Sequence, residues 1–77
     1  MNLQLRQLHG SDVVRARQRG GFVLKRVRGS HHILTHSQDK TRRATVPVHA
    51  GRTVKTGTMR SILAQAKLTE DQMVALL

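Results

Sequence analysis

The sequence predicts an α+β domain in which three antiparallel strands form one sheet and the helices cover one of its faces. Two segments rich in strand-forming residues, 22–28 and 31–36, are separated only by Gly29-Ser30, which indicates a β-hairpin. A third such segment, 43–48, follows a short polar loop. Because helical patterns precede and follow these segments, the predicted order of elements is α-β-β-β-α.

The first helix is predicted between Ser11-Asp12, an N-cap signal, and Gly20-Gly21, a stop signal. Val13, Val14 and Ala16 give this helix a thin apolar side. Its remaining residues, Arg15, Arg17, Gln18 and Arg19, are placed elsewhere on the helix.

The predicted hairpin has a two-residue turn with glycine at its first central position, where the backbone needs a positive φ. A turn of this length pairs Arg28 with His31 and places Arg26 and Ile33 on the same face of the ribbon. In the third strand, Pro47 cannot donate a ladder hydrogen bond, so this strand is predicted at an edge of the sheet.

Two further helices are predicted near the C-terminus. Thr58 is expected to cap a helix with an i, i+3, i+4, i+7 apolar pattern, formed by Met59, Ile62, Leu63 and Ala66. Thr69, with Gln72 three positions later, suggests a capping box for a short last helix.

Together these elements have the layout of a double-stranded-RNA-binding domain followed by a short C-terminal helix. Successive hairpins place the strands in one sheet, and both main helices must lie on the same face to bury their apolar stripes. We predict a single domain over residues 11–77. Residues 1–10 fit neither period and are predicted to be an N-terminal extension of unknown structure.

The charge balance indicates a polyanionic partner. Among 77 residues there are 14 Lys and Arg against 4 Asp and Glu, giving a formal net charge of +10. Ten of the cations are arginines, which bind phosphate in a bidentate manner. Nucleic acid is therefore the expected partner, since each phosphate contact releases counterions.

Several classes of protein are excluded by composition. The chain has no Cys, so disulfides and thiolate metal sites are ruled out. Phe22, the only aromatic residue, cannot supply the stacking platform of an RRM or OB-fold. A domain this small has no room for a deep cofactor pocket, so no cofactor is predicted. Without an apolar run for a signal peptide or membrane span, the chain is predicted to be cytoplasmic.

Four motifs resemble those of the HicA toxins, in the same order and at the same spacing. They are Gly20-Gly21-Phe22, Gly29-Ser30-His31-His32, Val46-Pro47-Val48-His49, and the segment Lys55-Thr56-Gly57-Thr58-Met59-Arg60-Ser61-Ile62-Leu63. The resemblance covers about residues 11–77. Arg17 departs from it, because the family places an apolar residue at this point of the first helix.

The resemblance implies the toxin of a toxin–antitoxin pair, an mRNA endoribonuclease inhibited by a HicB-type antitoxin. It also implies a catalytic histidine in the Gly-Ser-His motif, here His31. We expect the antitoxin to be acidic where it contacts the toxin, and we expect no membrane partner.

The residues around His31 suit metal-independent RNA cleavage by general acid/base catalysis. Imidazole can take the 2′-hydroxyl proton or protonate the leaving 5′-oxygen, since its ordinary pKa lies near 6.5. Arg26 and Arg28 are predicted beside His31, where they would bind RNA and stabilise charge on the phosphate. Gly29 and Ser30 are predicted to support the site through the turn.

A second RNA contact is predicted at the start of the helix that follows residue 57. Lys55 and Arg60 flank this point, and the free backbone N–H groups and positive dipole of a helix N-terminus attract phosphate. A capped helix with solvated charges is the structural alternative, and the two are compatible.

The other histidines are given lesser roles. His32 faces away from His31 and is interpreted as structural, and His36 is also given no catalytic role. His49 assists only if the loop after the third strand folds back toward His31. His32 and His36 lie about 13 Å apart in an extended strand, too far to share a zinc ion, so no metal site is predicted.

Two other functions remain open from the residues alone. A non-catalytic RNA-binding module of the same fold explains the charge but not the Gly-Ser-His-His motif. An interaction subunit with a basic face for an acidic partner also explains the charge.

Overall fold

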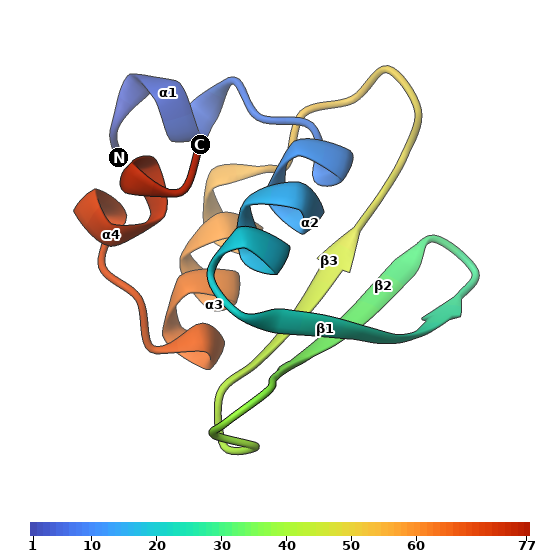
Figure 1. The fold of residues 1–77 in the computed structure, drawn as a ribbon. Coiled ribbons are helices and arrows are strands. Elements are labelled where there is room, and N and C mark those ends of the chain that lie inside the picture. The colour runs from blue at the N-terminus through green and yellow to red at the C-terminus, as the bar shows by residue number, and fades with distance from the viewer.

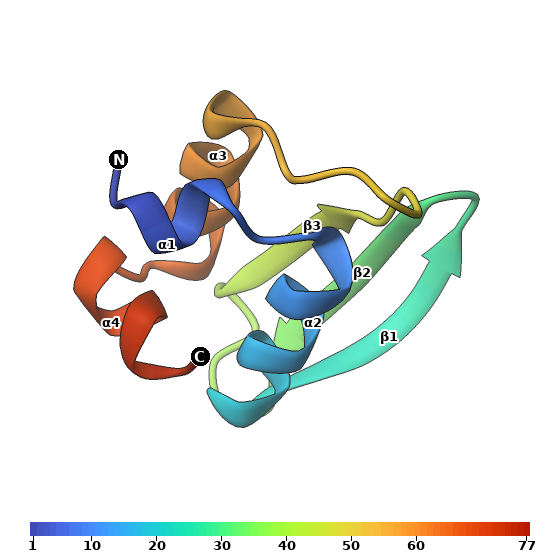
Figure 2. The ribbon, with the colours of Figure 1, turned by 90° about the horizontal axis from the view of Figure 1, so that it is seen from above.

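The computed structural model describes residues 1–77 and confirms the predicted α+β fold (Figure 1). The elements are α1 (Leu3–Arg6), α2 (Gly10–Arg19), β1 (Phe22–Arg28), β2 (His31–His36), β3 (Arg43–Pro47), α3 (Thr56–Ala66) and α4 (Glu70–Ala75). The strands form one antiparallel sheet in the order β1-β2-β3, so β3 is an edge strand as predicted. The helices lie together on one side of this sheet (Figure 2).

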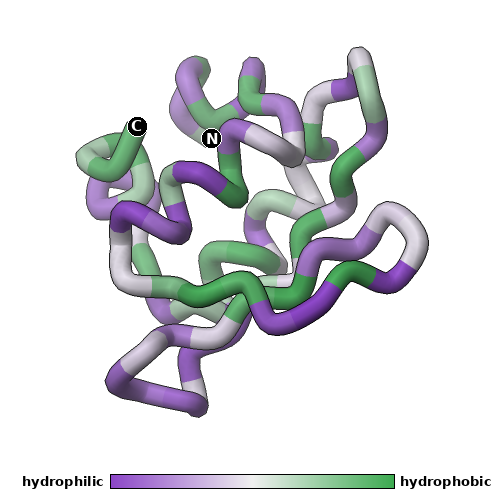
Figure 3. Tube along the Cα trace, turned by 45° about the vertical axis from the view of Figure 1, so that its right-hand side comes forward, coloured by the Kyte–Doolittle hydropathy of each residue, from purple (hydrophilic) through white to green (hydrophobic).

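The core lies between this face of the sheet and the helices. Leu34, Ala44 and Val46 from the strands are fully buried against residues of α2 and α3 such as Val13 and Ile62. Figure 3 shows mostly hydrophilic colour on the loop between β2 and β3, at the bottom of the view. No helix has the length and apolar character needed to span a bilayer.

Helix α2 begins earlier than predicted. Its N-cap is His9 rather than Ser11, because the Asp12 carboxylate accepts a hydrogen bond from the His9 backbone N–H at 2.9 Å. A Cβ added to Gly10 would lie 2.2 Å from the Pro47 carbonyl oxygen, so glycine permits the close approach of α2 to β3. The predicted stop is confirmed, since α2 ends at Arg19 and Gly20 is its C-cap.

Arg17 lies on the buried side of α2, and its prediction away from the apolar side was wrong. It follows Val13 by four residues and therefore shares the face that Val13 buries. The Arg17 side chain is fully buried, and its guanidinium carbon lies 5.6 Å from the centre of the Phe22 ring. None of its three guanidinium nitrogens has a hydrogen-bond partner.

The hairpin has the predicted two-residue turn and register. Arg28 pairs with His31, and Arg26 pairs with Ile33. Gly29 has φ of 57°, whereas Ser30 has no positive φ, which corresponds to a turn of type II′. A Cβ on Gly29 would meet nothing within 4 Å, so glycine is needed here for its backbone conformation only.

A β-bulge at Lys25 determines which side chains of β1 lie on each face of the sheet. The sequence pattern did not reveal this bulge. The register shifts between Leu24 and Arg26, so Lys25 is the extra residue. In a regular strand Phe22 would face the same way as Arg26 and Arg28. With the bulge, Phe22 enters the core while both arginines lie on the open face of the sheet.

Helix α3 also begins earlier than predicted, at Thr56, with Lys55 as its N-cap. Thr58, predicted to be the cap, is instead in the first turn. The helix ends at Ala66, and its C-cap Lys67 is the only non-glycine residue with positive φ, at 56°. The capping box of α4 is confirmed, since Thr69 and Gln72 exchange backbone-to-side-chain hydrogen bonds at 2.9 and 3.1 Å.

Residues 1–10, whose structure the sequence left open, pack against the rest of the chain. Leu5 of α1 is fully buried and belongs to the hydrophobic core. The Asn2 backbone N–H donates to the Glu70 carboxylate at 2.7 Å, which connects α1 to the start of α4. The segment therefore contributes a residue to the core.

Candidate functional site

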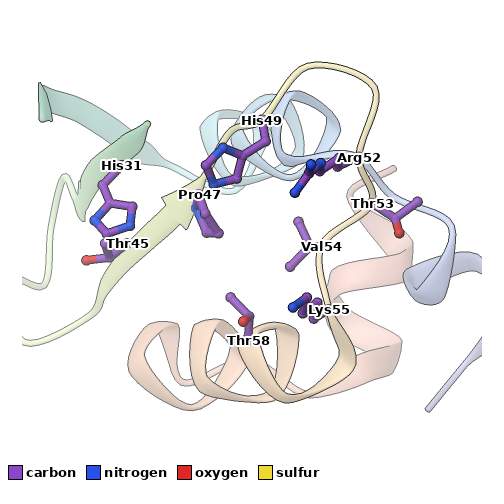
Figure 4. Close-up of a pocket in the computed structure, with 9 residues that line it drawn as sticks. All are labelled: His31, Thr45, Pro47, His49, Arg52, Thr53, Val54, Lys55 and Thr58. Carbon is purple, nitrogen blue, oxygen red and sulfur yellow. The ribbon is translucent and has the colours of Figure 1, made fainter. Parts of the chain in front are cut away.

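A pocket of about 390 Å³ lies between the open face of the sheet, the loop after β3 and the start of α3 (Figure 4). We call it the histidine pocket. It is lined by His31, Thr45, Pro47, His49, Arg52, Thr53, Val54, Lys55 and Thr58. Segments far apart in the sequence thus form one cavity near the tip of the hairpin.

His31 is the first residue of β2 and an exposed member of this lining. Its strand neighbours are Arg28 on β1 and Pro47 on β3, so these three residues form one row across the sheet. The two-residue turn fixes this row, because a slip of one residue would move His31 to the opposite face.

His49 lines the same pocket as His31, which the sequence left conditional on the path of the loop. The Val48 backbone N–H donates to the Ser30 carbonyl at 2.7 Å. This bond holds the chain after β3 beside the hairpin turn, so the next residue reaches the pocket. In Figure 4 the two imidazoles lie at the sheet end of the pocket, and Lys55 and Thr58 lie at its α3 end.

Backbone hydrogen bonds hold the loop from 48 to 55 in place. The Arg52 N–H donates to the His49 carbonyl at 3.1 Å, and the Val54 N–H donates to the Leu8 carbonyl at 2.9 Å. His9 and Thr53 form an isolated bridge, and the Val54 side chain is buried. The segment between α1 and α2 therefore supports one wall of the pocket.

Of the two RNA contacts predicted at the start of α3, one lies in the histidine pocket and the other does not. Lys55 lines the histidine pocket, as does Arg52, which the sequence analysis did not single out. Arg60 does not line this pocket. It follows Thr58 by two residues, about 200° around the helix, and so projects from the other flank.

The two arginines of β1 also differ in position. Arg28 pairs with His31 but lines neither pocket, whereas Arg26 lines a second pocket adjacent to the first. Both side chains are exposed on the open face. They extend the basic surface beyond the histidine pocket along the hairpin.

His32 and His36 have structural positions. His32 pairs with Val27 and Val46, on the face opposite to His31. His36 packs edge-on against the Phe22 ring, with centroids 5.1 Å apart, and its Nδ1 accepts from the Gln38 N–H at 3.2 Å.

Cationic and polar groups surround the histidine pocket, and no carboxylate lines it. The four acidic residues lie elsewhere: Asp12 in α2, Asp39 in the β2–β3 loop, and Glu70 and Asp71 in α4. No cluster of three or more His, Cys, Asp or Glu side chains is arranged to hold a metal ion. The pocket therefore suits an anionic ligand bound by arginine, lysine and imidazole.

Comparison with known proteins agrees with this description. No curated protein matches the sequence. The family model of the HicA toxin of bacterial toxin–antitoxin systems matches residues 10–68, from the start of α2 to just beyond α3. The match includes both histidines of the pocket and spans well over half of the sequence, so the chain belongs to the HicA toxin family.

Proposed function

We propose that this protein is a metal-independent endoribonuclease that cleaves mRNA and is inhibited by a HicB-type antitoxin. The observation that carries the proposal is the single pocket that holds His31, His49, Arg52 and Lys55 without any carboxylate. Cleavage of RNA by attack of a 2′-hydroxyl on the neighbouring phosphate needs an acid, a base and positive charge. The two imidazoles can supply the acid and the base, and Arg52 and Lys55 can supply the charge.

The proposed reaction needs one base and one acid. One imidazole takes the proton of the 2′-hydroxyl, and the resulting oxygen attacks the phosphorus. The bond from phosphorus to the 5′-oxygen breaks, and the other imidazole protonates that oxygen as it leaves. The products are a 2′,3′-cyclic phosphate and a free 5′-hydroxyl, so atoms and protons balance without a metal ion.

The start of α3 is the proposed binding site for the phosphate. Helix N–H groups of the first turn point away from the helix body, and the positive end of the helix dipole adds to the charge of Lys55. Thr58 offers a hydroxyl group at the same end of the pocket, and Arg52 approaches from the loop. These donors would stabilise the negative charge that develops on the phosphoryl oxygens.

Cleavage of RNA by the purified protein in EDTA tests this function. We expect cleavage to persist, and mass spectrometry of the fragments to show 2′,3′-cyclic phosphate and 5′-hydroxyl ends. A requirement for a divalent cation would contradict the mechanism. Intact RNA that binds with a steep salt dependence would instead support a non-catalytic RNA-binding module.

His49→Ala is expected to lower kcat by about 100-fold or more, because general acid/base groups contribute on this scale. With only one imidazole left, the rate profile should lose one limb of its bell-shaped pH dependence. His9→Ala is the control, because it removes an exposed imidazole outside the pocket while the bridge to Thr53 is formed by the backbone. An unchanged pH profile in His49→Ala would remove His49 from the mechanism.

A substrate with sulfur in place of the leaving 5′-oxygen separates the two roles. Sulfur leaves without protonation, so it should restore cleavage to the variant that lacks the acid and not to the variant that lacks the base. We expect rescue of either His31→Ala or His49→Ala, but not of both.

Membership of the HicA toxin family implies a cognate antitoxin as partner. We place its contact over the histidine pocket, where Arg52 and Lys55 would attract acidic side chains in place of phosphate. Inhibition would then follow from direct competition with RNA for the same cations.

A further inference from the structure

A second pocket, of about 410 Å³, lies beside the histidine pocket and has no role in the proposed chemistry. We call it the glutamine pocket. It is lined by Arg26, Ile33, Thr41, Arg43, Thr45 and Gln65. Thr45 lines both pockets, so the two cavities are contiguous on the open face of the sheet.

The sheet register relates the two pockets directly. Arg28, His31 and Pro47 form one row across the strands, and Arg26, Ile33 and Thr45 form the next row on the same face. Successive rows on one face lie about 7 Å apart. An extended nucleotide step covers a distance of this order, so RNA bound at His31 would bring a neighbouring nucleotide to the glutamine pocket.

Hydrogen bonds hold the wall of the glutamine pocket that the β2–β3 loop forms. The Thr41 hydroxyl donates to Asp39 at 2.6 Å and accepts from Lys67 Nζ at 2.9 Å. The neighbouring Arg42 donates from Nε to the Ala66 carbonyl at 2.8 Å, which ties the β2–β3 loop to the end of α3. This wall of the cavity is therefore held in place by the protein's own contacts.

The lining suits a base with its attached phosphate. Arg26 and Arg43 supply planar cations that can pair with phosphate or stack on a base. Half-buried Ile33 gives an apolar surface between them, and no carboxylate lines the cavity. Stacking on an aromatic ring is excluded, because Phe22 is buried on the other face.

Gln65 is the lining residue that can distinguish one base from another. Its side-chain amide offers a donor and an acceptor side by side, the pattern that pairs with the N6 and N7 edge of adenine. The side chain is exposed at the edge of the cavity. Arginine and threonine in the same lining are less selective.

We infer that the glutamine pocket binds the nucleotide next to the scissile phosphate and that Gln65 selects its base. The inference rests on the proposed ribonuclease function, because it places the RNA relative to His31. Arg26 and Arg43 provide affinity for any sequence, and the Gln65 amide gives a preference for adenine at one position beside the cut.

Cleavage of an RNA library with randomised bases tests the selection. The wild-type protein should cut with an adenine preference at one position next to the cleaved bond. Gln65→Ala should reduce that preference roughly fivefold or more, the loss expected for one base contact. Gln18→Ala, at an exposed glutamine of α2 outside both pockets, should keep the preference. Equal profiles for Gln65→Ala and Gln18→Ala would overturn the inference.

A binding measurement separates this inference from the ribonuclease proposal. NMR titration with a 2′-O-methyl tetranucleotide, which cannot be cleaved, should shift the amide signals of Ile33, Arg43 and Gln65. These shifts would support the pocket even if the protein does not cleave RNA. Shifts confined to the histidine pocket would overturn it, as would shifts produced at Gln65 by an acidic peptide but not by the nucleotide. The latter result would identify a docking site for a protein.

Discussion

His31→Ala is expected to lower the rate of RNA cleavage by 100-fold to 10,000-fold, the range for loss of a general acid or base. His31 lines the pocket with Arg52 and Lys55, and the only other histidine that lines it is His49. RNA binding should change little, since it depends mainly on the exposed arginines and lysines. Single-turnover cleavage and filter binding on the same preparations measure the two effects.

His31→Gln is the matched variant for this prediction. Glutamine keeps a polar side chain of similar reach on the exposed end of β2 but cannot exchange a proton near neutral pH. We expect it to be as inactive as His31→Ala. Activity within a few fold of wild type in either variant would show that the chemistry occurs at other residues.

Arg17→Met is expected to stabilise the protein by about 3 kcal/mol near neutral pH, which corresponds to a rise in Tm of roughly 10–20 °C. Burial, and then the charge of Arg42, lowers the pKa of Arg17 to about 10. The guanidinium is held charged against this penalty, without a hydrogen-bond acceptor, and the contact with Phe22 offsets only part of the penalty. Methionine fills a similar elongated space without a charge.

The lowered pKa of Arg17 also predicts how the stability gained in Arg17→Met depends on pH. The native state has the lower pKa for Arg17, so above about pH 10 it binds fewer protons than the unfolded state. The free-energy penalty of burying the charged Arg17 guanidinium is complete below pH 10, and it declines as the pH rises above that value. The advantage of Arg17→Met should thus narrow by about 1 kcal/mol between pH 7 and pH 11.

Urea unfolding of both proteins at the two pH values tests this prediction. Arg15→Met is the control, because Arg15 is an exposed arginine of the same helix whose ion pair with Asp12 contributes little. A loss of stability in Arg17→Met would mean that the buried guanidinium is favourably solvated in the native protein.

The sequence was sufficient for those features that depend on neighbouring residues. The turn at Gly29-Ser30 has only two residues, so it determined the Arg28–His31 pair and placed His31 on the open face. The order of the strands followed from short connections, and Pro47 identified an edge. The position of His31 was therefore predictable without knowledge of any distant contact.

Features that depend on distant contacts were not predictable in this way. His49 reaches the pocket because Val48 bonds to Ser30 and Val54 bonds to Leu8, and neither bond has a local sequence signature. Residues 1–10 looked aperiodic because α1 has a single buried side chain, that of Leu5. Arg17 is buried because it lies four residues after Val13 on the helix, whereas its charge alone predicts an exposed position.

The bulge at Lys25 also affects how copies of this protein behave at high concentration. An open strand edge invites another chain to extend the sheet, and repeated addition produces fibrils. On β1 the extra residue breaks the regular ladder and increases the local twist, and Lys25, Arg26 and Arg28 would face like charges on an incoming copy. The irregularity that places Arg26 and Arg28 on the open face of the sheet therefore also disfavours amyloid-like aggregation.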